Sequence, residues 1–214
     1  MKKFVKVLLV MVCSVLLVAA SIAGTLAYLT STKAVANTFT AGKVAITLDD
    51  IATNQYGKTI DQEGNQTGIA SETYRLDASQ GKKNTYKLVP GLEYTKDSQI
   101  HVAAGSEPCY LFVKIDPRFV AIDSTIVATL STNKWLPLTN VDNVYYYELV
   151  VDASNSDTPV DVLVLDTFTV DTTATSQSLA EFNETTASII AYAVQKEGLN
   201  LEQAWNAVKD TTPN

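Results

Sequence analysis

The residues that could carry out acid–base or nucleophilic chemistry lie between positions 97 and 109. His101 is the single histidine of the 214-residue chain, and Asp97, Ser106 and Cys109 lie near it in the sequence. A Ser-His-Asp or Cys-His site would have to use this histidine. Nothing in the spacing arranges these side chains into a triad, and His101 alternates with apolar neighbours, which directs it toward solvent on a strand. We therefore expect a protein that is not an enzyme.

A metal centre is the second kind of chemistry to consider. Zinc needs several His, Cys or carboxylate ligands, and the chain has one histidine and no H-E-x-x-H motif. Acidic residues gather at Asp49–Asp50, Asp152–Asp157 and Asp161–Asp171, but their spacing matches no EF-hand. A carboxylate calcium site stays open, although a solvated acidic surface is the interpretation that we favour. The sequence thus predicts no metal and no cofactor.

The N-terminal segment has the three parts of an export signal. Three lysines stand in the first six residues, the stretch from Val7 to Leu29 has no charge, and its end is rich in small residues. We expect a signal peptide over residues 1–27, cleaved between Ala27 and Tyr28, with Ala23 as the second choice. An uncleaved anchor is the alternative, because an uncharged run of this length spans a bilayer core of about 30 Å.

Removal of residues 1–27 would leave 187 residues, enough for one sizeable core. The remaining chain would carry a net charge of −10 in place of −7, which disfavours nucleic acid as a partner. Its one cysteine, Cys109, could form no internal disulfide, and its place in an alternating segment indicates a small buried core residue.

The elements that would position these residues are mostly strands. Phe39 to Leu48 alternates in polarity and predicts a half-buried strand that ends at Asp49 and Asp50. Pro90-Gly91 predicts a turn with glycine at positive φ. The other predicted strands are Tyr74–Leu76, Thr85–Val89, Ile100–Ala103, Cys109–Asp116, Trp135–Leu138, Val144–Val151, Val160–Val170 and Ala187–Gln195.

These strands are separated by turn-rich loops without βαβ alternation, so we predict an antiparallel β-sandwich of jelly-roll type. We expect Ile100–Ala103 to pair with Cys109–Asp116, and the latter to be a central strand because both of its faces are apolar. A short helix is expected within residues 175–184, and a C-terminal helix after an Asn200 N-cap. The predicted organisation is a signal helix (1–27), a flexible segment (28–38), a β-domain (39–198) and a C-terminal helix and tail (199–214).

Three blocks of the sequence carry a resemblance to a known family. The first, TLAYLTSTKAVANTFTAGKVAITLDD, holds an N-x-F-x-x-G-x-V-x-I pattern that runs from Asn37 to Ile46. The others are LVPGLEYTKDSQIHVAAGSEPCYLFVKI and IIAYAVQKEGL. Together they resemble the TasA/camelysin family of secreted Gram-positive proteins. The resemblance implies maturation by a SipW-type signal peptidase, a jelly-roll-like sandwich, and a role as a fibre-forming component of the biofilm matrix or cell surface.

The functional hypothesis is a secreted structural protein that assembles after signal cleavage. A free N-terminal strand can add itself to a sheet edge of the next subunit, and an open contact of this kind grows a filament. The pocket-filling residues would be Val35, Phe39, Val44, Ile46 and Leu48, unless residues 39–48 pair within their own sheet. The expected partners are the signal peptidase, further copies of the chain and related matrix proteins, with membrane contact only through an uncleaved signal segment.

Two other functions remain open at this stage. A monomeric surface adhesin would carry its specificity in the loops at 51–73 and 152–159. A camelysin-like secreted metallopeptidase would need a set of metal ligands, and the sequence supplies almost none.

Overall fold

The structure, a computed structural model, describes residues 30–32, 44–67, 74–77, 82–182 and 187–211. The described chain is mostly β, with two antiparallel sheets and few short helices. The predicted signal helix, its cleavage site at Ala27 and Tyr28, and most of the segment before Val44 lie outside the described residues.

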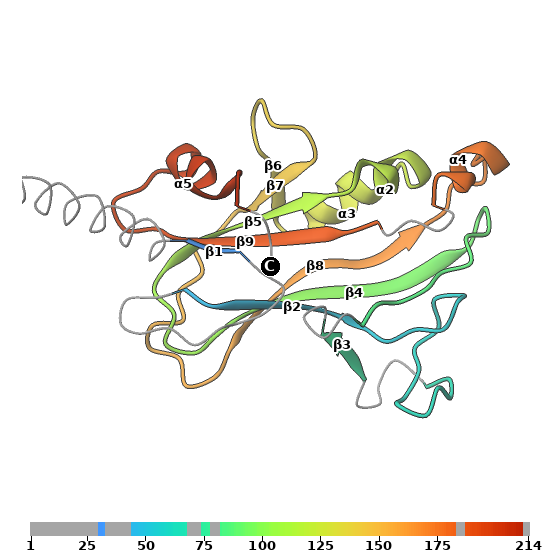
Figure 1. The fold of residues 1–214 in the computed structure, drawn as a ribbon, viewed down its shortest axis with the longest axis horizontal. Helices are drawn as coiled ribbons and strands as arrows, with labels where there is room; N and C mark the ends of the chain where they lie inside the picture. Colours follow the sequence, from blue (N-terminus) through green and yellow to red (C-terminus); the bar gives the residue numbers. More distant parts are fainter. Residues whose placement is uncertain (1–29, 33–43, 68–73, 78–81, 183–186, 212–214) are drawn as a thin grey trace, which may run out of the picture.

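The first sheet has five strands, in which every neighbouring pair is antiparallel. Their order across the sheet is β1 (Thr30–Thr32), β9 (Ile189–Gln195), β5 (Cys109–Ile115), β7 (Val144–Tyr147) and β6 (Trp135–Pro137). The second sheet has the order β3 (Arg75–Asp77), β2 (Ile46–Ile51), β4 (Glu93–Val102) and β8 (Val160–Thr169). Figure 1 shows the two sheets as two layers, with β5 and β9 above β2, β4 and β8.

The main core lies between the two sheets. On β5, the alternate residues Cys109, Leu111, Val113 and Ile115 are fully buried, and they share one cluster with apolar side chains of β2, β4 and β8. The expected central position of this strand is confirmed, because β5 lies in the middle of its sheet. The prediction that Cys109 is a small buried residue is confirmed as well.

A second, smaller core covers the outer face of the first sheet. Phe112 and Tyr192 point to this side, where they contact Trp205 of α5 (Leu201–Val208) with ring centroids 5.5 Å apart in each pair. The predicted N-cap is confirmed, since the Asn200 side chain accepts a hydrogen bond from the Gln203 amide. The apolar face of the amphipathic C-terminal helix therefore packs against the outer face of the first sheet.

Three further helices connect the strands: α2 (Pro117–Ile122), α3 (Ile126–Thr132) and α4 (Ser176–Ala180). The last of these confirms the helix expected within residues 175–184. The turn at Pro90-Gly91 is confirmed too, with Gly91 at φ +80° and the Leu92 amide bonded to the Val89 carbonyl at 3.1 Å.

The predicted pairing of Ile100–Ala103 with Cys109–Asp116 is wrong. These segments belong to different sheets, since β4 pairs with β2 and β8, whereas β5 pairs with β9 and β7. The connection between them crosses from one layer to the other, and Gly105 adopts φ +74° within it while its amide donates to the Ala153 carbonyl. The two segments are close in the sequence, which suggested a hairpin. In the structure, each strand instead pairs with neighbours in its own sheet.

Two other predictions about strands are also wrong. Thr85–Val89 is not a strand, because the Lys87 amide donates to the Gln55 carbonyl and the Val89 amide to the Tyr94 hydroxyl. β2 does not end at its aspartates but runs through to Ile51. The strand can continue because basic partners on neighbouring strands pair with both carboxylates.

Candidate functional site

The proposed assembly residues fall into two groups. Val35 and Phe39 lie outside the described residues. Val44, Ile46 and Leu48 are buried in the core of their own chain, and β2 pairs with β4 on one side and with β3 on the other. In the isolated chain, this part of the candidate segment is therefore an internal strand of the second sheet.

The N-terminal strand β1 occupies an edge of the first sheet. Thr30, Ser31 and Thr32 pair with Val194, Ala193 and Tyr192 of β9, so residues far apart in the sequence lie side by side (Figure 1). In the described part of the chain, this pairing covers three of the seven residues of β9. The outer side of β9 is consequently the place where an N-terminal segment and a sheet edge already meet.

The opposite edge of the first sheet is short. β6 has three residues and includes Pro137, which has no amide hydrogen to give to a further strand. In the second sheet, β3 is the edge on one side and is also only three residues long.

The ten-residue edge strand β8 is partly closed by side chains. The indole Nε1 of Trp135 donates to the Leu163 carbonyl at 2.8 Å, and Asn133 donates to the next carbonyl along the strand at 3.3 Å. The Thr169 amide donates to the carboxylate of Asp123 at 2.8 Å. Bonds of this kind use up backbone groups that an added strand would need.

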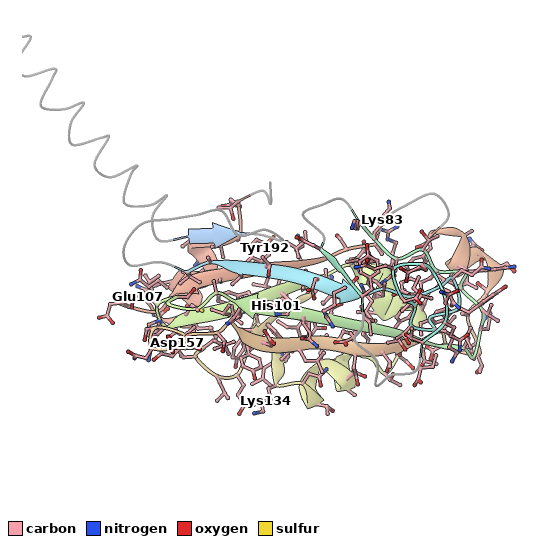
Figure 2. All side chains as sticks on the ribbon, turned by 90° about the horizontal axis from the view of Figure 1, so that it is seen from below. Lys83, His101, Glu107, Lys134, Asp157 and Tyr192 are labelled. Carbon is pink, nitrogen blue, oxygen red and sulfur yellow. The ribbon has the colours of Figure 1, made fainter. Side chains whose placement is uncertain are left out.

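His101 lies on the outer face of the second sheet, on β4 (Figure 2). Its Nδ1 is 2.6 Å from Oδ1 of Asp161 on β8, and its Nε2 is 3.0 Å from Oδ2 of Asp49 on β2. The bond to Asp49 is the largest effect on the pKa of His101, which is raised to about 9. Burial opposes this rise, and the bond to Asp161 adds to it. The ring is therefore protonated at neutral pH and binds three strands together.

Asp49 has a second basic partner. The Nε of Arg75 lies 2.7 Å from its Oδ1, and Arg75 also bonds to the side chain and the carbonyl of Asp97. Burial acts to raise the pKa of Asp49, but the bonds from His101 and Arg75 outweigh this effect and lower the pKa. This row of alternating charges is structural. It corrects the expectation of a solvated acidic surface at Asp49, and Asp50 on the other face of β2 is likewise paired, with Lys96.

The residues that could have formed a triad do not meet. Asp97 bonds to Arg75, the Ser106 hydroxyl accepts from the Ala45 amide at 3.3 Å, and the direct partners of His101 are the two other aspartates. Cys109 is buried, and this burial, followed by the charge of Asp152, raises the pKa of its thiol to about 12. A thiol in this state is a poor nucleophile.

Within the described ranges, no group of three or more His, Cys, Asp or Glu side chains is arranged to hold a metal ion. None of the helices in the described part of the chain has the length and apolar character that a bilayer crossing requires.

Sequence reasoning missed the charged row on the second sheet. Alternation placed His101 on the outer face correctly, but the row depends on which residues lie opposite it, and this is set by the strand register. A pairing of β2 with β4 would have brought Asp49 and His101 together on one face.

Comparison of the chain with protein-family models, with curated proteins and with solved structures returned no match.

Proposed function

We propose that this chain is a secreted structural protein that forms fibres in the biofilm matrix or at the cell surface of a Gram-positive bacterium. In this proposal, a SipW-type signal peptidase cleaves between Ala27 and Tyr28, and the new N-terminal segment adds to a sheet edge of the next copy. The two antiparallel sheets would form a jelly-roll-like sandwich, and related matrix proteins could join the fibre.

The pairing of β1 with β9 is the observation that carries the proposal. Within the described residues, β1 adds to the sheet edge through three residue pairs. Each backbone hydrogen bond contributes about 1 kcal/mol net, so a short strand of this kind is released at small cost. Exchange with the same segment of another copy recreates the lost bonds, which is the principle of domain swapping and of strand addition.

The buried position of Val44, Ile46 and Leu48 limits which residues can belong to the donated strand. Removal of β2 from between β3 and β4 would break the second sheet and expose three core side chains. We therefore assign the donated segment to residues 28–43, with β9 as the receiving edge. The side-chain bonds along β8, and the short length of β6 with its Pro137, favour β9 over these two other edge strands.

The native N-terminus provides the first test. Residues 28–214 with Tyr28 as the first residue should form fibres that are visible by electron microscopy. In size exclusion, the monomer peak should decrease as the fibres form. A matched protein with several extra residues before Tyr28 should assemble more slowly or not at all. A native form that stays monomeric over a wide range of concentration and pH would refute self-assembly.

A further inference from the structure

Lys96 and Asp50 form an ion pair on the core side of the second sheet. Lys96 lies on β4 between Tyr94 and Ser98, which are both fully buried and point to the same side. Its side chain is 10% exposed and that of Asp50 is 22% exposed, and Nζ is in direct contact with Oδ2. A lysine in this position is unusual, because a buried ammonium loses its hydration.

Both oxygens of the Asp50 carboxylate have a partner. The hydroxyl of Ser98, which is the residue opposite Asp50 in the pairing of β2 with β4, donates to Oδ1 at 2.5 Å. Lys96 contacts Oδ2. Among the described residues, one carboxylate oxygen is thus held by a hydroxyl donor and the other touches a primary amine.

Aromatic side chains lie beside this pair. The ring of Tyr86 packs edge-on against Tyr94 and Phe168, with centroids 5.6 and 5.3 Å away, and its hydroxyl donates to the Thr95 carbonyl next to Lys96. Burial raises the pKa of Tyr86, and the negative charge of Asp50 adds to this rise, which places the carboxylate near the ring. The pair therefore lies at the border of the apolar core.

From this arrangement we propose that Lys96 and Asp50 join covalently through an amide bond between Nζ and Cγ. One proton of the Lys96 ammonium group first passes to Oδ2, so that the neutral amine nitrogen Nζ can attack Cγ, and the bond from Cγ to Oδ2 then breaks. In total, two protons of the ammonium group pass to Oδ2, which leaves as water, and the third stays on the new amide nitrogen. An ammonium and a carboxylate become one neutral amide and one water molecule, so the step requires no oxidant, reductant or activated group.

Two features of the site favour this condensation. The fold holds the amine against the carboxyl group, which replaces an encounter between separate groups by an intramolecular reaction. The product removes two poorly hydrated charges from the border of the core and releases a water molecule to the bulk.

Ser98 is the positioning residue of this reaction. Its hydroxyl can stabilise the negative charge that develops on Oδ1 during attack. The same hydroxyl can then donate to the carbonyl oxygen of the amide, so the product leaves this buried group paired.

The amide would join β2 to β4 across 46 positions of the chain. A covalent link of this length restricts the unfolded chain in the way that a disulfide does. It would also stabilise the fold covalently without a disulfide, since Cys109, the one cysteine among the described residues, is buried and unpaired. The inference does not depend on fibre formation, and a monomeric protein could carry the same link.

Mass spectrometry of the purified full-length protein tests the proposal directly. The intact mass should be one water molecule below the mass of the sequence. Trypsin should fail to cleave after Lys96 and should release a branched peptide that joins residues 44–58 to residues 88–114, again one water molecule lighter. Separate, unmodified peptides 44–58 and 88–96 would overturn the proposal, and N-terminal processing does not affect this result.

Variants provide the matched controls. Lys96→Arg keeps the positive charge but should retain the full mass, and its Tm should fall by about 10 °C because the cross-link is lost. Lys87→Arg changes an exposed lysine of the preceding segment and should still lose one water molecule. Loss of water in Lys96→Arg would contradict the assignment. Ser98→Ala should form the amide more slowly after synthesis, as followed by the loss of one water molecule from freshly translated protein, and an unchanged rate would remove Ser98 from the mechanism.

Discussion

The Nε2 atom of His101 lies 3.0 Å from Oδ2 of Asp49, across the boundary between β4 and β2. With Asp161 on the other side of the ring, this contact raises the pKa of His101 from 6.5 to about 9. The protonated ring therefore stabilises the fold fully below pH 6.5, and this contribution is lost as the pH rises through about 9.

The first prediction concerns this pH dependence. His101→Gln should lower the free energy of unfolding by about 1–2 kcal/mol at pH 6, a value that allows for partial solvent screening. The difference between wild type and variant should disappear above pH 9, as measured by urea unfolding across this range. Asp161→Asn should retain part of the pH-dependent stabilisation, because Asp49 still pairs with His101. A difference that stays constant with pH would contradict the assignment.

A second prediction follows from the close approach of Gly57 to Tyr94. Gly57 has φ +72°, and a Cβ atom there would lie 2.6 Å from the Tyr94 Cα. Gly57→Ala should destabilise the protein by about 3 kcal/mol or prevent folding. Gly64→Ala is the control, because Gly64 also has a positive φ, +85°, but no atom within 4 Å. It should cost about 1 kcal/mol, and equal losses would show that the contact is unimportant.

Trp135 of β6, whose indole bonds to β8 at the edge of the second sheet, provides a third prediction. The side chain is fully buried, and its Nε1 donates to the Leu163 carbonyl at 2.8 Å. Trp135→Phe leaves this carbonyl unpaired and a smaller ring in the core, so the free energy of unfolding should fall by about 2–4 kcal/mol. Asn133→Ala removes the longer bond of 3.3 Å and should cost about 1 kcal/mol or less. Chemical denaturation would measure both, and the reverse order would refute this assignment.

Cys109 should be unreactive in the folded protein. Burial raises the pKa of its thiol to about 12, and the side chain has no exposed surface. Labelling by a thiol reagent at pH 8 should be about 100-fold slower in native buffer than in denaturant. Equal rates would mean that the strand carrying Cys109 opens readily, which the central position of β5 does not allow.

The sequence predicted strands best where their residues alternate over a buried face. β5, β8 and β9 were expected close to their observed bounds, and the C-terminal helix was expected from Asn200 and the spacing of its apolar residues. Pairing was predicted less well, because Ile100–Ala103 and Cys109–Asp116 are neighbours along the chain but belong to different sheets. Polarity patterns report which face is buried and carry little information on which strand lies beside which.

The charged side chains show the same limit. Asp50 was expected in a solvated acidic surface and Lys96 was assigned no role, although both face the core side of the second sheet. The positive φ of Asp97 and the shift in register beside it help to bring Lys96 toward Asp50. Irregularities of this kind depend on tertiary packing, and no local sequence signal marks them.

The central claim is that β1 leaves β9 of its own chain and pairs with β9 of another. Cysteines at Thr30 and Val194, which lie opposite each other in the antiparallel pairing, would lock the two strands within one chain. We predict that oxidised Thr30→Cys/Val194→Cys, prepared with Tyr28 as first residue, stays monomeric and forms fibres once reduced, while Thr30→Cys alone assembles like wild type. Fibres from the oxidised, locked protein at the wild-type rate would contradict the account.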